Sequence, residues 1–411
     1  MTERVTVSPP SYSEDMEPVE TMTVRYDYRL RVSRSAEREL LAEWDRDRWV
    51  WNQCVATSRA AHAGGEECGP ARLDEILTGW RVEHPWLREG SSVAQQQTIR
   101  DFGAARAKAL ADRKAKLPMR QRRGMPKFKR KAEALPTLNY TLRGFSIKEG
   151  KLCLANGIGL SVVWSRELPS APSSVRVYRD ATGKWWASFV VKVQVEPLPA
   201  TGQVIGIDWG VTETATTTDP GFDLPHAQHG KKASAGLAHY QRQMARRRPK
   251  PGQKASAGYR KAKAHAAKNY HQVVGRRRDD ARKWAKKVVR EFDQIAAEDF
   301  RPKFLAGSTM ARKAADAAIA TAKAELVHMA AKHGRELRLV NPAYTTMDCA
   351  NCGARAKHRL LLSERTYTCG SCGVSKPRDR NSAAVMVARA GFDPAGVDRI
   401  RLERPLGARA A

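Results

Sequence analysis

Hydrophobic residues recur along this chain with two different periods, and each change of period marks a new segment. Residues 21–32 alternate between apolar and polar, with arginines on the polar side, which is typical of a half-buried strand. From Ser35 the period is helical; a second helix is expected near 73–82, and a third where Ser92 can cap it. The pattern therefore predicts a small helical domain after the first strand.

A period of two returns between residues 137 and 200. The expected strands are 152–154, 160–164, 175–178 and 185–193. The sequence Asp180-Ala181-Thr182-Gly183 provides the turn of a hairpin between the last two strands. If the strand at 21–32 pairs with these, the helical domain is an insertion in a small β-barrel.

Two strand-like runs in the second half of the chain end in an acidic residue. The first delivers Asp208 and the second delivers Glu298, which is followed by Asp299. Since adjacent side chains of a strand point to opposite faces, we expect Glu298 and not Asp299 to face the same site as Asp208. A third acid, Asp379, stands at the start of a predicted helix.

The segments around these acids complete a second, α/β pattern. Residues 212–218 are expected to return beside the first strand as a hairpin. An alanine-rich helix is expected at 310–332, with Ser308 able to cap it and Gly334 able to end it. Residues 337–340 form one more predicted strand. This order is the one expected for the opening of an RNase H-like sheet.

Four of the seven cysteines form two CxxC pairs, Cys349 with Cys352 and Cys369 with Cys372, sixteen residues apart and each followed by glycine. Zinc prefers four thiolate or imidazole ligands in a tetrahedron, and a four-cysteine site has no open position for chemistry. We therefore expect one structural Zn²⁺ in a small module. The other three cysteines have no partner at metal spacing and are expected to be ordinary thiols.

The composition indicates a polyanionic partner, because 73 Lys and Arg against 43 Asp and Glu give a net charge of +30. Residues 231–290 alone hold twenty Lys or Arg and two acids, and a further basic run at 111–133 includes Phe128. Such runs fit phosphate contacts with steep salt dependence, although a solvated linker or helix face is the alternative. The residues expected to contact nucleic acid are Arg122, Arg123, Lys127, Lys129, Arg242, Arg246, Arg247, Arg276, Arg277, Arg278, Arg378 and Arg380.

The three acids indicate a metal site only when they are considered together. Each of Asp208, Glu298 and Asp379 alone would usually be a turn or cap residue. Together, on two strand ends and a helix start, they are suited to hold two Mg²⁺ ions about 3.5–4 Å apart for phosphodiester hydrolysis. Arg378 and Arg380, which flank Asp379, either touch phosphate or form surface ion pairs. On so basic a chain, metal-assisted cutting of nucleic acid is the favoured chemistry.

The chain has no run of 18 or more apolar residues, and residues 1–20 are polar and acidic. We therefore expect no membrane span and no signal peptide. Residues 1–20 are expected to be a disordered leader.

With these features assembled, the sequence resembles the TnpB family of transposon-associated proteins and the related miniature type V CRISPR effectors. The matching stretches run over nearly the whole chain, from about residue 22 to 390, and the C-terminal ones are highly specific. They are Gly206-Ile207-Asp208-Trp209-Gly210-Val211, Ala297-Glu298-Asp299, Asn341-Pro342-Ala343-Tyr344-Thr345-Thr346, the two CxxC-Gly units and Asp379-Arg380-Asn381-Ser382-Ala383.

The resemblance implies a multidomain α+β fold. A wedge-like β-barrel would hold an inserted helical recognition domain, and a RuvC nuclease domain of the RNase H-like type would hold the inserted zinc module. The domain boundaries we expect are a leader at 1–20, barrel strands at 21–34, a recognition domain at 35–118, the rest of the barrel with a basic linker at 119–200, a first RuvC-like nuclease segment at 201–343, a target nucleic-acid-binding zinc module at 344–376, and a second RuvC-like nuclease segment with the C-terminal tail at 377–411.

The resemblance also implies a function, that of an RNA-guided DNA endonuclease with Asp208, Glu298 and Asp379 as its metal-binding acids. Its partners would be a guide RNA and double-stranded target DNA with a short flanking motif and a displaced single strand. It would act in the cytoplasm of a prokaryotic cell, at the nucleoid when on target, as a monomer or homodimer.

Two departures from the family pattern and two alternatives accompany this expectation. Pro377 stands where TnpB proteins commonly have an acid, and the segment 301–310 is closer to compact CRISPR-associated relatives. Neither departure removes a proposed metal ligand. The alternatives are a guided DNA-binding protein that silences its target with little or no cleavage, and an RNA-free transposase or resolvase.

Overall fold

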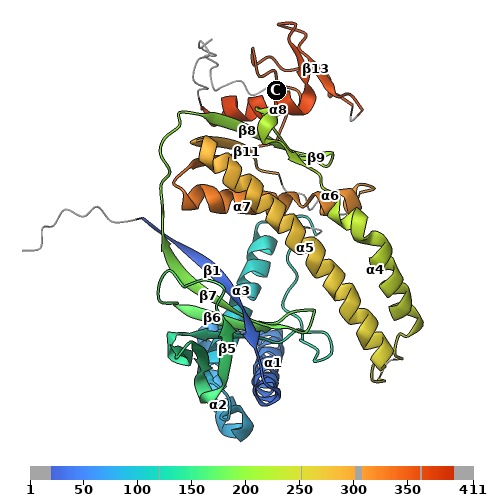
Figure 1. Ribbon diagram of the computed structural model, residues 1–411. Helices are drawn as coiled ribbons and strands as arrows, with labels where there is room; N and C mark the ends of the chain where they lie inside the picture. The colour runs from blue at the N-terminus through green and yellow to red at the C-terminus, as the bar shows by residue number, and fades with distance from the viewer. Residues whose placement is uncertain (1–19, 120, 251, 301–307, 362, 393–411) are drawn as a thin grey trace, which may run out of the picture. The chain divides into compact units, whose positions relative to one another are not determined.

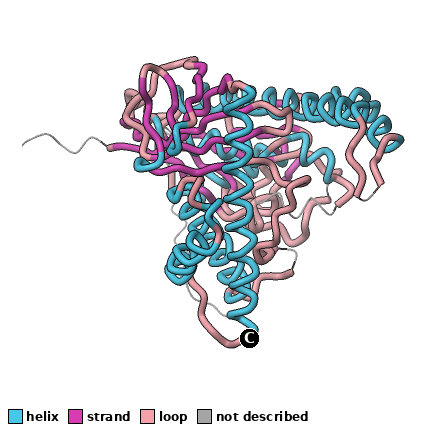
Figure 2. Tube along the Cα trace, turned by 90° about the horizontal axis from the view of Figure 1, so that it is seen from below, coloured by secondary structure: helices cyan, strands magenta, loops and turns pink. Residues whose placement is uncertain are grey.

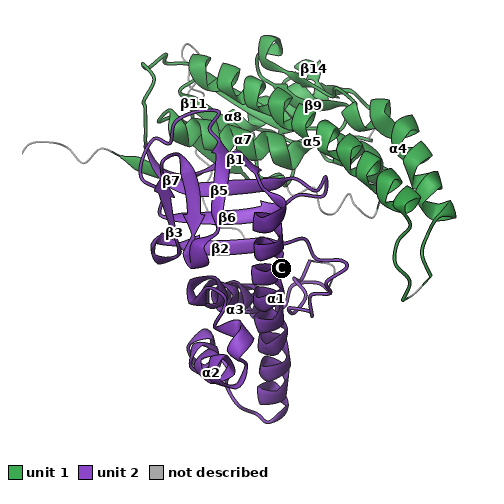
Figure 3. Ribbon diagram, turned by 60° about the horizontal axis from the view of Figure 1, so that its bottom comes forward, with its two compact units in different colours: residues 1–22, 194–411 green, residues 23–193 purple. Residues whose placement is uncertain are grey.

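The computed structural model describes residues 20–119, 121–250, 252–300, 308–361 and 363–392 (Figure 1). Helices and strands are mixed throughout (Figure 2), so the fold is α+β. Two compact units are present: residues 23–193 form one, and the residues on either side of that range form the other (Figure 3). Almost all of the expected leader, residues 301–307 and the C-terminal tail from 393 lie outside the described residues.

The unit at 23–193 contains a seven-stranded sheet with the strand order β2-β6-β7-β1-β5-β4-β3. Its strands are β1 Thr21–Arg31, β2 Thr137–Thr141, β3 Phe145–Lys148, β4 Lys151–Leu154, β5 Gly159–Val163, β6 Ser174–Arg179 and β7 Trp185–Gln194. The two end strands, β2 and β3, follow each other in the chain with only the short helix η2 Leu142–Gly144 between them. The sheet is therefore a nearly closed antiparallel barrel, with Tyr28, Leu138 and Phe189 buried inside.

The expected strands of this barrel are confirmed, and so is the hairpin between β6 and β7. The turn is held by Asp180, whose Oδ1 accepts hydrogen bonds from the backbone N–H groups of Thr182 and Lys184. Gly183 has φ +84°, a conformation that favours glycine. The strands β2 and β3 were not predicted.

The helices of this unit lie between β1 and β2 in the chain, as the sequence predicts. They are α1 Arg34–Ala63, α2 Pro70–Glu83, the short η1 Pro85–Leu87 and α3 Ser92–Lys114. Their core contains Cys54, Leu73, Leu87 and Ile99. The expectation that Ser92 caps α3 is wrong by one residue, because the side chain of Ser91 accepts the hydrogen bond from the N–H of Ala94.

The other unit is built on a five-stranded mixed sheet with the strand order β10-β9-β8-β11-β12. Its strands are β8 Val204–Trp209, β9 Glu213–Thr217, β10 Leu224–Pro225, β11 Gln294–Glu298 and β12 Glu336–Val340. The strands β8, β11 and β12 are parallel, whereas β9 returns antiparallel beside β8. The four long strands of this sheet follow the predicted pattern.

Helices cover both faces of this sheet. The helices of this unit are α4 His229–Arg246, α5 Ala257–Glu291, α6 Ala311–Ala317, α7 Ile319–Lys332 and α8 Arg378–Ala390, of which α4 packs on α5. The helices α5 and α7 pack with Ile205, Ile207 and Ala297 in one core, whereas α8 packs with Ala296 in a second core. In Figure 1, α5 and α7 accordingly lie on one side of β8 and β11, and α8 lies on the other.

The alanine-rich helix predicted at 310–332 is broken in two. Ala318 has φ +54° and separates α6 from α7. The N-cap residue of α6 is Met310, so the predicted cap at Ser308 is wrong, whereas Gly334, with φ +62°, follows the end of α7 as expected. Alanine favours helix at every position, so the composition of this segment conceals the break.

A small module between β12 and α8 contains the CxxC pairs. Its sheet is formed by β13 Thr366–Thr368 and β14 Ser375–Pro377, and a single bridge joins Asp348 to Arg355. Within the described ranges, no helix has the length and apolar character needed to cross a membrane.

Candidate carboxylate and cysteine sites

Strand register places Asp208 and Glu298 side by side. The strands β8 and β11 are parallel, with Ile207 aligned to Ala297, so each acid is the next residue on its own strand. Because side chains alternate, both acids face away from the α5 and α7 core that holds Ile207 and Ala297. They therefore share the face of the sheet that α8 covers.

The helix α8 can approach this face closely because of a glycine. A Cβ atom at Gly206 would lie 1.9 Å from the backbone oxygen of Ala383 on α8, closer than any two such atoms can come. Asp379 lies in the first turn of α8. The glycine two residues before Asp208 thus lets α8 bring Asp379 to the same face.

The pKa of Asp208 indicates that the other two acids lie near it. The pKa of Asp208 is raised well above its usual value by burial and by the negative charges of Glu298 and Asp379, with the charge of Arg378 opposing them. A negative charge shifts a neighbour's pKa only over a short range. The structure therefore places Glu298 and Asp379 near Asp208, with the oxygen atoms of the three acids not all within 4.8 Å of one another.

Glu298 is 7% exposed, and burial raises its pKa to about 7 despite a backbone hydrogen bond from Trp209 and the charge of Lys323. Its neighbour Asp299 forms an ion pair with Lys323 of α7, which lies on the other face of the sheet. The alternation predicted for these two acids is therefore present. A cation bound beside Glu298 would favour its charged form and lower this pKa.

The arginines on either side of Asp379 are engaged within the protein. Arg378 is 9% exposed, donates to Asp379 at 3.1 Å, and donates to the backbone oxygens of Leu361 and Glu364. Arg380 forms an ion pair with Asp223 at 2.8 Å. These contacts match the ion-pair alternative for both residues.

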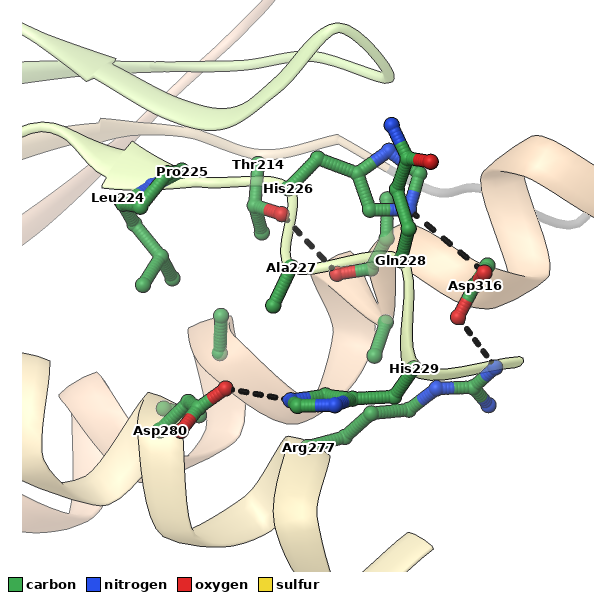
Figure 4. Close-up of a pocket in the computed structure, with 14 residues that line it drawn as sticks. Thr214, Leu224, Pro225, His226, Ala227, Gln228, His229, Arg277, Asp280 and Asp316 are labelled. Atoms are coloured by element: carbon green, nitrogen blue, oxygen red, sulfur yellow. Dashed lines mark hydrogen bonds and ion pairs between the residues drawn. The ribbon is translucent and has the colours of Figure 1, made fainter. Parts of the chain in front are cut away.

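A polar cluster at the start of α4 explains the position of Arg277 (Figure 4). The carboxylate of Asp316 accepts from the N–H groups of Gly230 at 2.6 Å and Lys231 at 2.9 Å, and pairs with Arg277 at 2.7 Å. Asp316 of α6 thus caps α4, whose own first residue provides no side-chain cap. Arg277 stabilises the fold here.

The other arginines on α4 and α5 that are predicted to contact nucleic acid differ in whether they already have a partner within the protein. Arg278 pairs with Glu325 at 2.8 Å. Arg247 hydrogen-bonds Gln243 of its own helix. The remaining predicted contacts here, Arg242, Arg246, Arg247 and Arg276, are exposed and form no ion pair among the described residues.

The basic segment after α3 is held against α1. The ring nitrogen of Trp51 donates to the backbone oxygen of Lys127, and the Nζ of Lys129 lies 3.7 Å from the centre of the Trp51 ring. Burial lowers the pKa of Lys129. Arg123 is exposed, and Arg122 donates to the backbone oxygen of Leu117. Of this predicted set, Lys127 and Arg123 have side chains free to reach phosphate.

The four cysteines of the CxxC pairs form a tight cluster. Their sulfur atoms all lie within 4.8 Å of one another, and among the described residues no other group of potential metal ligands does so. The glycines after the pairs, Gly353 and Gly373, both have φ +70°, as the tight turns require. Four thiols at this spacing fit one tetrahedral Zn²⁺.

Backbone amides prepare one of these thiols for a metal. The N–H groups of Cys372 and Ser371 point at the Sγ of Cys369, at 3.5 Å and 3.4 Å, and lower its pKa to about 6. A thiolate is the form that binds metal. The knuckle therefore favours the ligand state of Cys369.

Residues that the site prediction missed join the cysteine module to α8. Asn381 is fully buried, donates to the backbone oxygen of Asp348 and accepts from the N–H of Ala350. Ser382, also fully buried, hydrogen-bonds Thr345 at 3.5 Å. Both residues directly follow Asp379 and Arg380 in a stretch that carried the family resemblance. That stretch was therefore a signal in the sequence by which they could have been found.

Two family models match this unit of the protein. Residues 188–307 match OrfB_IS605, described as "Probable transposase", and residues 321–386 match the Cas12f1-like TNB domain. The chain belongs to the TnpB/OrfB family. The first match contains Asp208 and Glu298, and the second contains the four cysteines and Asp379.

Relatives align with this family member over nearly its full length. A Streptomyces pristinaespiralis protein named as an RNA-guided DNA endonuclease is 29% identical over 387 residues, which cover 92% of this chain and 92% of the relative. InsQ of Escherichia coli K12, with the same kind of name, is 25% identical over 401 residues, covering 93% and 96%.

Among solved structures, the Cas12f1 complex with single-guide RNA and target DNA aligns with 89% of this chain and 98% of its own. The TM-score is 0.46 and the identity 13%. A likeness of that degree carries no functional argument.

Proposed function

We propose that this protein is an RNA-guided DNA endonuclease in which Asp208, Glu298 and Asp379 bind two Mg²⁺ ions. The observation that carries the proposal is the meeting of these three acids on the face of the sheet that α8 covers, where the charges of the other two raise the pKa of Asp208. The names of the full-length relatives support the same function.

The residues fit divalent cations because Asp208 and Glu298 lie on the face of the sheet that α8 covers, and the charge of Asp379 on α8 reaches Asp208. Arg378 and Lys323 each oppose one acid, yet the pKa values of Asp208 and Glu298 remain raised. Carboxylate oxygens are the ligands that Mg²⁺ prefers. When bound there, Mg²⁺ would supply water activation and stabilisation of the leaving oxygen.

The rest of the chain has a role in this proposal. The five-stranded sheet is the RuvC nuclease domain of the RNase H-like type, and the cysteine module, with one structural Zn²⁺, is its nucleic-acid-binding insertion. The barrel is the wedge, and α1 to α3 form the recognition domain for the guide–target duplex. The unpaired arginines of α4 and α5 would contact phosphates.

Two linked measurements test the proposal. The RNA that copurifies with the full chain is sequenced, and the purified complex is incubated with matching DNA that carries a randomised flank, with and without Mg²⁺. We expect one discrete RNA species and Mg²⁺-dependent cleavage that depends on a short flanking motif.

The possible failures separate the alternatives. A discrete RNA with target binding, but no cleavage by the wild type, would indicate a guided binding protein. The absence of any discrete RNA would indicate an unguided transposase or resolvase. Either result would contradict the proposed function.

A further inference from the structure

The helical part of the unit at 23–193 contains a cavity of about 250 Å³ that lies apart from the carboxylates and the cysteines. It is formed by α1, α3 and the loop that follows α3. About eight water molecules would occupy that volume in the liquid, which is the scale of one nucleobase with its sugar and too small for a stacked pair.

The floor and one wall of this cavity are apolar. Val55 and Phe102, each 2% exposed, lie at its base, and Met125 and Pro126 form a wall from the loop. Leu110, which is 39% exposed, lies at its edge. Apolar surface of this kind accepts a flat ring and offers little to a free inorganic anion.

The rest of the lining is basic. Arg59, Arg106 and Arg113 contribute side chains, together with His62, and no acidic residue lines the cavity. None of the three arginines forms an ion pair in the part of the chain that the structure describes. Three positive charges around one cavity without a counter-charge favour an anionic occupant.

One of these arginines is also incomplete in its hydrogen bonding. The Nε of Arg106 is buried and has no hydrogen-bond partner. A buried N–H without an acceptor is costly, so Arg106 would gain from a rearrangement that brings an acceptor oxygen to its Nε. Arg59 lies over the ring of the exposed Phe128, 4.9 Å from its centre, and so adds a flat cationic surface beside the cavity.

We propose that this cavity binds one unpaired nucleotide of a nucleic-acid strand, with the base on the apolar floor and the phosphate at the arginines. The inference rests on the proposed function, since it takes the occupant to be part of the RNA that the protein carries. Single-stranded RNA is commonly bound by stacking a splayed base and neutralising its phosphate.

The first test is photo-crosslinking of the full chain to a mixed-sequence single-stranded RNA that contains 4-thiouridine. Crosslinks are expected on the peptides that contain Phe102 and Met125. Leu110→Trp, which fills the cavity from its exposed edge, should lower these crosslinks about fivefold or more and leave those on α5 unchanged. Arg106→Gln should do the same, and it serves if the tryptophan variant fails to fold.

The second test is the salt dependence of binding to the same RNA. Each phosphate contact on a single strand contributes about 0.7 to the slope of log K against log salt. Arg59→Gln with Arg113→Gln should therefore reduce the slope by about 0.7, because the two arginines are proposed to share one phosphate. Arg72→Gln is the matched control, because Arg72 is exposed on α2, lies outside the cavity and pairs with Glu75; it should leave the slope unchanged.

Several results would overturn the proposal. The first is that crosslinks spare the cavity peptides, and the second is that the double variant keeps the wild-type slope. The third is saturable binding of AMP, CMP, GMP or UMP that Leu110→Trp abolishes, with no RNA crosslinks. That third result would indicate a site for a free nucleotide. The cavity proposal and the proposed function can fail independently. DNA cleavage without cavity crosslinks would reject only nucleotide binding in the cavity. Cavity crosslinks without DNA cleavage would reject only the nuclease activity.

Discussion

The two clusters of potential metal ligands in this protein are built in opposite ways. The cysteine cluster comes from one short module, with Cys349 and Cys372 only 23 residues apart, and its sulfur atoms are already within 4.8 Å of one another. The carboxylate cluster comes from β8, β11 and α8, and after burial the charges of Glu298 and Asp379 raise the pKa of Asp208.

We therefore expect the metal at the cysteines to stabilise the fold of its module, and the metal at the carboxylates to bind a site that the fold has already formed. Thiols in a local knuckle gain their geometry from the metal, so metal binding and folding are coupled. Buried carboxylates held by a separate core repel one another without a cation, so they weaken the fold while preparing the site. Substitutions should therefore affect stability in opposite directions at the two clusters.

The largest effect is expected at the cysteines. Cys369→Ser should reduce zinc content from one per chain to nearly none, because structural zinc contributes on the order of 10 kcal/mol to such modules. The module should then be cut readily by protease, and cleavage of DNA should be lost because the module is bonded to α8. Metal analysis and limited proteolysis measure this, with Cys153→Ser, outside the cluster, as the control that keeps its zinc.

At the carboxylates we expect loss of activity with a gain of stability. Asp208→Ala should lower DNA cleavage by about 10³-fold or more, since a bound metal supplies several kcal/mol to the reaction. The melting temperature in EDTA should rise, because a buried carboxylate next to two others is removed. Asp299→Asn, on the opposite face, is the control and should keep most of the activity; a lower melting temperature for Asp208→Ala would contradict the comparison.

The close packing of α8 on β8 offers a third test. Gly206→Ala should destabilise the protein by about 1–3 kcal/mol and impair cleavage, because its Cβ would overlap Ala383 and displace α8. Gly275→Ala on the exposed side of α5 meets nothing within 4 Å and should stabilise by about 0.5–1 kcal/mol. Denaturant melts and cleavage assays of both variants decide this, and equal behaviour of the two would refute the packing argument.

The most gradual effect is a pH dependence at Glu298. Burial raises its pKa from 4.5 to about 7, so the folded protein holds a proton that the unfolded chain releases. Stability without metal should therefore be greatest below pH 4.5 and fall as pH rises to about 7, by at most about 1.4 kcal/mol per pH unit. Urea melts in EDTA across this range measure it, and Glu298→Gln should flatten the curve.

The local features of this fold could be predicted from the sequence, and the contacts between distant segments could not. The cysteine spacing and the acids at the ends of β8 and β11 identified their sites because each signal lies within a few residues. The break at Ala318 escaped prediction because alanine is compatible with helix on both sides. The close approach at Gly206 and the buried Asn381 depend on where α8 lies, which no short window contains.

The basic residues show the same limit. Arg277 and Arg378 looked like phosphate contacts in a charged stretch, and the structure pairs them with Asp316 and Asp379. Charge counts cannot separate a paired arginine from a free one. The acidic partners come from other elements, so only the folded chain distinguishes the two kinds.

The central claim is that Asp208, Glu298 and Asp379 form one divalent-cation site. Crystals of the full chain soaked in Mn²⁺ and measured at the manganese absorption edge test it most directly. The account predicts anomalous density between the three carboxylates in the wild type and its loss in Asp208→Ala, with the cysteine cluster unchanged in both. Manganese bound elsewhere, with the three carboxylates empty in the wild type, would contradict it.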